Sequence, residues 1–460
     1  MGCSGSNATA PSPAIAPGAE ALDARRVAER LVREHGASGV HPRVREVVPG
    51  FDGPFFQAGL AGYSDAAMRI IARRHGCPYC VTEALLDRTL LAGGRGFTKA
   101  DLGELHDNVP GGTEDHPLAG QLMGCESREM AAAALKLVEQ GARADREYRR
   151  LAYNGALAPG AERHLRLPGG EQIGRGKWPN GQRAKGPNGS GGDDHSRADL
   201  SFAAIDVNLA CPVKKIASKA RGGHWLAEPE GAIRMLEAVR EALPASVPTT
   251  VKMRRSFDDT PEMAEAFRRI LDAAYDMGYA WATVHARTVE QKYVGPSRWD
   301  VLRQVVREAR QRDPERVVFG SGDVWGAADV FRMIGYTGVN AAAVARGCIG
   351  NPWVFRQARQ IMAGETPTAP SIPEQRAVLE EHFTLALAVN AGARRPEAYT
   401  GKTMRKFGIR FAEHHPRAEE VRRRFVGVCS LEDWRGVLEE CYSSGPIAER
   451  GSVAGSLLDS

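Results

Sequence analysis

Eight short apolar runs alternate with helix-like segments between residues 55 and 345, and this alternation constrains the fold more than any other feature. The apolar runs are Phe55–Leu60, Tyr79–Thr82, Ala119–Met123, Ala203–Val207, Thr249–Met253, Ala282–His285, Val317–Gly320 and Ala341–Ala345. The helical periodicity lies between them, in Ala66–His75, Arg128–Gln140, Pro229–Ala242, Pro261–Met277, Trp299–Gln311 and Ala327–Ile334. Strands that alternate with helices form parallel sheets, and eight such units predict an α/β fold closed into a (β/α)8, or TIM, barrel.

Changes in composition divide the chain around this barrel. Residues 1–48 are expected to form a partly disordered N-terminal appendage, and residues 49–365 the barrel. A segment at about 143–200 carries nine glycines between Gly169 and Gly192, so it is expected to be a flexible insertion. After Pro373 the strand signals stop and helical patterns follow in Glu374–Ala391, Glu397–Glu413, Ala418–Val426 and Leu431–Ser443. These predict a smaller helical domain over 373–445 and a flexible tail over 446–460.

The charge and cysteine content narrow the class of protein. The net charge of +5 is mild, but the segment 401–425 holds eight Lys and Arg against three Glu, a balance suited to phosphates. Eight cysteines are scattered singly, which favours a reducing cytosol over a disulfide scaffold. No apolar run approaches the roughly 18 residues that a membrane helix needs. We therefore expect a soluble, cytoplasmic monomer with no membrane contact.

Cys211 is the first candidate for chemistry, because it follows an apolar strand in the run 205–215. A single cysteine is more often a small core residue. Here Pro212 stops the strand and Lys214 and Lys215 make the neighbourhood positive, at the end of a barrel strand where catalytic groups lie. A thiol in that setting can serve as a nucleophile or a general acid.

Two further ionisable side chains stand at strand ends. Lys252 alternates with apolar residues, so it is expected to point into the barrel mouth, where a buried lysine needs an anionic or hydrogen-bonding partner. His285 ends the next strand, and taken alone it could equally be a histidine satisfied in the core. With Cys211, these residues place ionisable groups at three strand ends.

Glycine-rich turns follow the last two predicted strands. Ser321, Gly322 and Asp323 end one strand, and Ala345, Arg346 and Gly347 end the other. In TIM barrels a phosphate often binds between these two loops, because glycines let backbone amides approach it and an arginine adds charge. The pair predicts a phosphorylated cofactor.

Two other motifs carry weaker signals. Cys77 and Cys80 form a Cys-x-x-Cys pair, but it lies between a helix and a strand and further ligand pairs for zinc are missing, so neither a redox nor a metal site is expected. Asp65, after Tyr63 and Ser64, is expected to cap a helix.

Taken in order, these segments resemble the tRNA-dihydrouridine synthases, from about Pro54 to Phe355 and more weakly through the helical domain. Asn208 to Pro212 matches the family's Asn-x-Gly-Cys-Pro signature, with Ala210 in place of glycine. The opening Gln57–Asp65 is similar to the family's Ala-Pro-Met-Ala-Gly-x-Thr-Asp, with Gly59 where proline is usual. The other matching residues are Gln121, Lys252, the segment His285, Arg287 and Thr288, the segment 321–323, Ala345 with Arg346, and Gly350–Trp353.

The resemblance implies an FMN enzyme that uses NADPH to reduce uridine in tRNA, with no metal. It implies Cys211 as the catalytic acid. It implies FMN contacts from Gly59, Leu60, Ala61, Gln121, Lys252, His285, Ser321, Gly322, Asp323, Ala345 and Arg346. It implies substrate contacts from Asn208, Arg254, Arg287, Lys402, Arg405, Lys406 and Arg410. The departures at Gly59, Ala210, Gly223 and Ser321 are expected to loosen contacts without removing the chemistry.

Two other functions fit parts of the pattern. A flavin barrel of this kind could act on a free pyrimidine or another small molecule, although the basic helical domain argues against it. A tRNA-binding homologue with weak or no turnover would need the same basic domain, but the candidate residues Gln121, Cys211, Lys252, His285 and Arg346 are all present.

Overall fold

The computed structural model describes residues 18–91, 113–141, 165–166, 172–173, 202–213, 221–390 and 393–443. The predicted tail, Lys214 and Lys215, and most of the predicted insertion lie outside these ranges. Within the insertion, β5 (Leu165–Arg166) and β6 (Gln172–Ile173) form a short antiparallel pair.

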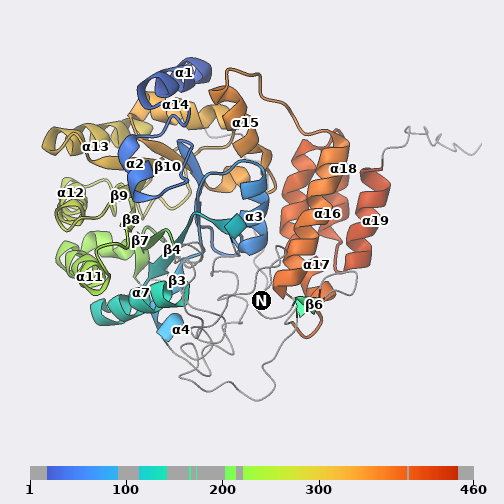
Figure 1. The fold of residues 1–460 in the computed structure, drawn as a ribbon, viewed down its shortest axis with the longest axis horizontal. Helices are drawn as coiled ribbons and strands as arrows, with labels where there is room; N and C mark the ends of the chain where they lie inside the picture. Colours follow the sequence, from blue (N-terminus) through green and yellow to red (C-terminus); the bar gives the residue numbers. More distant parts are fainter. Residues whose placement is uncertain are drawn as a thin grey trace, which may run out of the picture.

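The central sheet is a closed parallel barrel (Figure 1). Its strands are β1 (Phe55–Gln57), β2 (Cys80–Val81), β4 (Leu118–Met123), β7 (Ala204–Leu209), β8 (Thr249–Arg254), β9 (Trp281–His285), β10 (Val317–Ser321) and β11 (Ala341–Val344). They pair in the order β2-β1-β11-β10-β9-β8-β7-β4, and a β2–β4 pairing closes the ring. A short strand that the sequence did not suggest, β3 (Leu85–Leu86), adds to β4. The predicted TIM barrel is confirmed.

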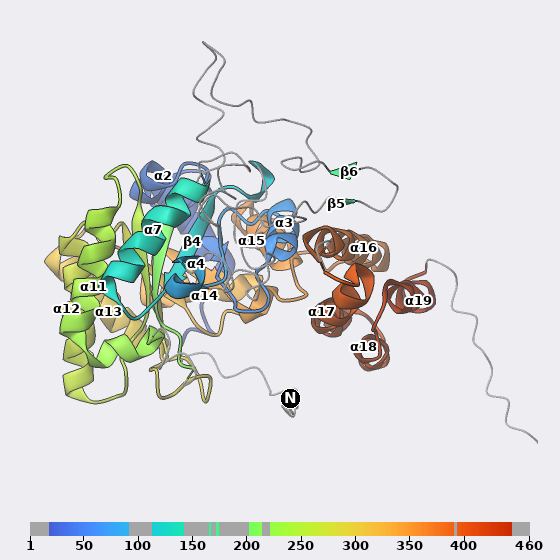
Figure 2. The same ribbon diagram turned by 90° about the horizontal axis from the view of Figure 1, so that it is seen from below.

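Helices surround the barrel, as the sequence predicts (Figures 1 and 2). They are α3 (Ala66–Arg74), α7 (Ser127–Gly141), α11 (Pro229–Ala242), α12 (Pro261–Asp276), α13 (Trp299–Arg312) and α14 (Ala327–Thr337). Two more, α4 (Asp87–Leu91) and α15 (Trp353–Met362), were not anticipated. The expected cap is present, because the Asp65 carboxylate accepts a hydrogen bond from the Met68 amide at 2.8 Å.

The segment before β1 closes the N-terminal end of the barrel. Helix α1 (Ala24–His35) packs on α14 and α15, and α2 (Pro42–Val47) follows it. Val40, Val44, Val48 and Phe51 join one apolar cluster with the first inward residues of the strands. We call this cluster the barrel floor, and its aromatic members are Phe51, Phe56, Tyr79, Trp281 and Phe319. Residues 24–48 therefore contribute to the barrel's core packing.

The C-terminal region is helical, as predicted, and consists of α16 (Ile372–Val389), α17 (Pro396–Phe411), α18 (Ala418–Val426) and α19 (Leu431–Cys441). It lies beside the barrel, with α16 next to α3 (Figures 1 and 2). Arg74 of α3 pairs with Glu381 of α16, and Arg356 of α15 pairs with Glu374 at 2.6 Å. Within the described residues, no helix is long and apolar enough to cross a membrane.

Candidate active site

Polar side chains line the inside of the barrel above the floor. Alternate residues of a strand share a face, so each strand carries its inward set at every second position. A small internal cavity has the floor aromatics Phe56, Tyr79 and Trp281 at one end. Its polar lining comes from Gln121, Asp206, Thr250, Lys252 and Thr283. The register places Asn208 beside Lys252, and His285 between Arg254 and Ser321. The candidate residues therefore meet at the carboxyl ends of adjacent strands.

A chain of hydrogen bonds crosses from β8 to the loop that carries Cys211. Thr250 Oγ1 donates to Asp206 Oδ1 at 2.6 Å, and Gln121 Nε2 donates to Asp206 Oδ2 at 2.6 Å. Asn208 Nδ2 then donates to Gln121 Oε1 at 2.7 Å, and the Ala210 amide donates to Asn208 Oδ1 at 2.9 Å. We call Asp206, Gln121, Asn208 and the Ala210 amide the Asp206 relay.

Cys211 follows β7 and is partly exposed, as a reacting group requires. Its carbonyl accepts a hydrogen bond from the Gly223 amide at 2.9 Å. At Gly222, where φ is +50°, an added Cβ would lie 2.9 Å from the Cys211 Cβ. At Gly223 it would lie 2.8 Å from Val289 Cγ2. Glycines in the segment after the cysteine therefore let the chain pass close to the thiol-bearing residue.

Burial shifts the protonation of the ionisable groups at the mouth. The pKa of Lys252 is lowered to about 8, chiefly by burial and then by the charge of Arg254, while Asp206 and Cys211 act in the opposite direction. Burial and the charges of Arg254 and Lys252 hold the pKa of His285 well below its ordinary value. His285 is therefore neutral at pH 7. Lys252 makes no hydrogen bond or ion pair with the residues described, which leaves its ammonium available to a ligand.

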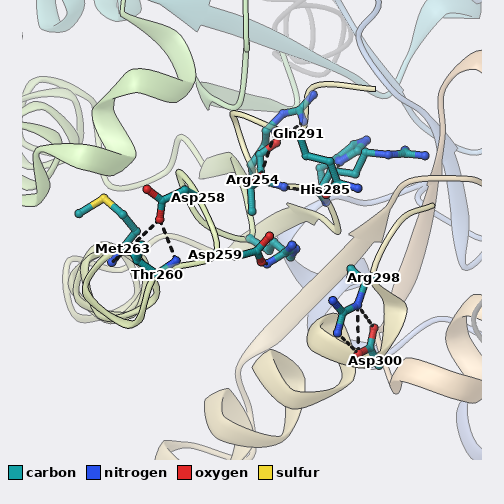
Figure 3. Close-up of polar contacts among 12 residues, drawn as sticks. Arg254, Asp258, Asp259, Thr260, Met263, His285, Gln291, Arg298 and Asp300 are labelled. Atoms are coloured by element: carbon teal, nitrogen blue, oxygen red, sulfur yellow. Dashed lines mark hydrogen bonds and ion pairs between the residues drawn. The ribbon is translucent and has the colours of Figure 1, made fainter. Parts of the chain in front are cut away.

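Arg254 ties the Cys211 loop to the loop that follows β9. Its Nε donates to the Ala210 carbonyl at 3.0 Å, and its Nη1 donates to the carbonyls of Thr288 and Lys292, each at 2.6 Å. Figure 3 shows Arg254 and His285 together beside Gln291 of the loop that follows β9. The sequence predicted that Arg254 contacts substrate, but the structure places its guanidinium on backbone carbonyls, where it holds the Cys211 loop against the β9 loop.

Asp323 organises the loops after β9 and β10. Arg287 Nη2 lies 2.8 and 2.7 Å from its two carboxylate oxygens, the Ser297 amide donates to it at 2.7 Å, and Arg346 lies 3.4 Å away. Arg287 is 1% exposed, so this predicted substrate contact is buried in an ion pair. Gly322 has φ of +117°, and an added Cβ would lie 2.3 Å from Ser297 Oγ.

Buried polar groups without partners lie in the loops after β9 and β10, next to Arg346 of the loop after β11. Within the described residues, Ser297 Oγ, Arg287 Nη1 and Trp325 Nε1 are buried and lack hydrogen-bond partners. Arg346 lies over the Trp325 ring at 4.6 Å. At Gly347 an added Cβ would lie 2.4 Å from the Val324 carbonyl oxygen. A half-buried arginine and unsatisfied buried donors together suit an anionic group.

The predicted turn after β1 is closed tightly on its neighbours. An added Cβ at Gly59 would lie 2.2 Å from the Thr82 carbonyl oxygen, so only glycine fits where the family usually has proline. Leu60 and Ala61 continue this turn, and the Leu60 amide donates to Ser64 Oγ at 2.8 Å. The departure at Gly59 is therefore matched to the local packing of this chain.

Helix α17 carries the predicted RNA-contacting cations, and one of them faces the barrel. Lys406 Nζ donates to the Gly62 carbonyl and lies 4.6 Å from the Tyr63 ring centre. Lys402 and Arg410 are exposed, and Arg405 is half-buried. Lys406 thus joins α17 to the turn after β1, while the other three cations remain near solvent.

Sequence reasoning omitted Asp206, Thr250 and Thr283 from the candidate site. The signal was available for all three, since each stands two positions before a predicted residue: Asn208, Lys252 and His285. The part played by Ser297 had no such signal, because that residue belongs to an irregular loop.

The comparisons with known proteins agree with this geometry. Residues 196–440, more than half of the chain, match a family model described as dihydrouridine synthase. A probable tRNA-dihydrouridine synthase of Treponema pallidum is 31% identical over 242 residues, which span 52% of this chain and 68% of that protein. One of Mycobacterium tuberculosis is 28% identical over 253 residues, spanning 54% of this chain and 62% of that protein. The tRNA-dihydrouridine synthase B of Shewanella oneidensis is 32% identical over 181 residues, which span 39% of this chain and 53% of that protein.

Among solved structures, one of morphinone reductase gives a TM-score of 0.36 at 14% identity, covering 70% of this chain and 88% of that one. The sequence matches are more informative. The chain belongs to the dihydrouridine synthase family. It is an enzyme of that family, and it spans about half to two thirds of the length of the relatives above.

Proposed function

We propose that this protein reduces specific uridines of tRNA to 5,6-dihydrouridine, with bound FMN, NADPH as reductant and Cys211 as general acid. The observation that carries the proposal is the convergence of Cys211, Lys252, His285 and Gln121 at the carboxyl ends of adjacent strands, in a chain of this family. We also propose that the enzyme is a monomer and acts in the cytoplasm.

The residues present fit a flavin mononucleotide. Its phosphate would be held by the loops after β10 and β11, where the close packing at Gly347 brings the two loops together and Arg346 adds charge. Gln121 would hold the ring and Lys252 its electron-rich edge. Lys252 has the most direct support, because its side chain is half-buried and makes no hydrogen bond or ion pair with the described residues, so its ammonium is available to a ligand.

When bound, reduced flavin supplies a hydride to C6 of the uracil. Cys211 would deliver a proton to C5, so that two hydrogens are added across the double bond. The Lys252 ammonium stabilises negative charge beside the ring, and neutral His285 can donate or accept one hydrogen bond there. Arg254 holds the Cys211 loop in place through the Ala210 carbonyl.

The target base must leave its stack to reach this site, which costs a few kcal/mol that backbone contacts have to offset. Helix α17 adjoins the barrel through Lys406 and presents Lys402, Arg405 and Arg410 near solvent. These three cations would contact tRNA phosphates. A free pyrimidine would have no use for this surface, which favours the RNA substrate.

The test is mass spectrometry of nucleosides from tRNA that lacks dihydrouridine, after incubation with FMN-loaded protein and NADPH. Free uridine and NADH serve as the alternative substrate and reductant. We expect uridine in tRNA to gain two hydrogens, and free uridine to remain unchanged. Reduction of free uridine but not tRNA would indicate the small-molecule enzyme, and a protein that binds tRNA but not FMN would indicate the non-catalytic homologue.

A further inference from the structure

We propose that Asp206 is a positioning residue for Cys211: its carboxylate sets the orientation of the Gln121 and Asn208 amides and so fixes the backbone just before the thiol. The role of that thiol as acid rests on the proposed function. The orientation of the relay does not.

The burial of Asp206 indicates that its carboxylate has a specific role. Asp206 is 4% exposed, and desolvation raises its pKa, while hydrogen bonds from Thr250 and Gln121 and the charge of Lys252 act against that rise. A neutral residue could satisfy the same neighbours at a lower desolvation cost. Both oxygens of Asp206 accept hydrogen bonds, so the surroundings are built for the ionised form.

The direction of the relay follows from one chemical asymmetry. A side-chain amide can turn over and exchange its donor for its acceptor, but a carboxylate only accepts. Asp206 therefore requires Nε2 of Gln121, which leaves Oε1 to face Asn208. Asn208 must then offer its Nδ2 to Gln121, which leaves Oδ1 for the Ala210 amide. Each orientation depends on the one before it, starting at Asp206.

The relay ends one residue before Cys211, where a change of direction would matter most. If the two amides turned over, Asn208 would present an N–H group to the Ala210 N–H, and the contact would be lost. The Ala210 carbonyl is held separately by Arg254, so the relay fixes the amide side of this residue. Gln121 and Asn208 are 1% and 8% exposed, which keeps water from replacing the lost bonds cheaply.

Substitutions at Asp206 and Asn208 test this direction. In Asp206→Leu, no carboxylate fixes the Gln121 amide, so Gln121 and Asn208 can turn over and the Ala210 amide can lose its acceptor. Adding Asn208→Asp restores that acceptor, because a carboxylate at position 208 accepts from the Ala210 amide in either orientation and can take Nε2 of Gln121. The matched control adds Asn208→Leu instead, which supplies no acceptor.

Two readouts need neither flavin nor RNA: hydrogen exchange of the Ala210 amide, and the alkylation rate of Cys211 by iodoacetamide, each located by mass spectrometry. We expect Asp206→Leu to speed Ala210 exchange about tenfold. Asp206→Leu with Asn208→Asp should return it to within about threefold of the wild type, whereas the control with Asn208→Leu should stay fast. Alkylation should follow the same order.

Unchanged Ala210 exchange in Asp206→Leu would overturn the proposal, and so would equal behaviour of the two double variants, because an acceptor at position 208 would then not matter. Additive effects of the two substitutions would overturn it too. In the tRNA assay, kcat should follow the exchange results with KM for tRNA unchanged. If the variants show the predicted exchange pattern but the wild type forms no dihydrouridine, the proposed function is refuted and the proposal for Asp206 still stands.

Discussion

The two ends of the barrel use the same strands for opposite purposes. Strand β9 shows this along one face, where Trp281 belongs to the apolar floor, Thr283 lines the cavity and His285 stands at the mouth. The floor residues gain stability by leaving water, with Phe51 stacked on Tyr79 at 4.6 Å. The mouth residues lose solvation, and Lys252 and His285 have lowered pKa values as a result. Stability is thus built at one end and reactivity at the other.

The largest expected effect is on the floor. Trp281 is 2% exposed and contacts Phe51, Tyr79 and Phe319. Trp281→Ala should lower the free energy of unfolding by about 3–5 kcal/mol, because the cavity cannot close fully. Urea unfolding measures this. The variant Cys211→Ala is the comparison at the mouth, and a similar loss of stability in both would contradict the separation of roles.

The sequence predicted much of this contrast and missed the parts that depend on tertiary structure. The period-two pattern directed Lys252 into the barrel mouth, His285 ended a predicted strand, and the family resemblance supplied Gln121. These signals could not show that α1 packs on α14 and α15 or that Val40, Val44 and Val48 join the barrel floor. They also could not show that Arg254 binds backbone carbonyls or that Lys406 binds the Gly62 carbonyl. Those contacts join segments far apart in the chain.

The second expected effect extends the contrast to α17. Reversing Lys402, Arg405 and Arg410 to Glu should weaken tRNA binding by about a hundredfold at low salt and reduce the salt slope by about two to three, since each phosphate contact contributes about 0.7 to 0.9. Filter binding over a salt series measures both. Lys406→Met is the control, because its ammonium is used at the barrel, and its salt slope should stay near that of the wild type. If the salt dependence of tRNA binding were unchanged in the triple variant, α17 would not contact the RNA.

A smaller effect is expected from the charge on Lys252. Its pKa of about 8 in the ligand-free protein means that the ammonium loses its proton as pH rises through 8. Binding the electron-rich flavin edge favours the charged form of Lys252, so the pKa of Lys252 is higher in the complex and the affinity must fall above pH 8. FMN titration by fluorescence should give a dissociation constant about tenfold larger at pH 9 than at pH 7. Lys252→Met should show weaker binding with little of this pH dependence, and the same dependence in that variant would exclude Lys252 as its source.

The smallest effect is expected outside both ends of the barrel. Arg298 and Asp300 form an exposed pair at 2.6 Å, apart from Arg254 and His285 in Figure 3. Because surface ion pairs contribute little, Arg298→Ala should change the free energy of unfolding by less than about 1 kcal/mol. Dihydrouridine formation should stay at the wild-type level. A larger change in either would show that charges outside the mouth take part in its organisation.

The central claim is that chemistry at the mouth depends on Cys211, and one measurement tests it most directly. Wild type and Cys211→Ala, both loaded with FMN, are incubated with NADPH and tRNA lacking dihydrouridine, and the modified nucleoside is quantified by mass spectrometry. The account predicts dihydrouridine from the wild type and at least about a hundredfold slower formation by the variant, the usual contribution of a general acid. Equal rates from the two proteins would contradict it.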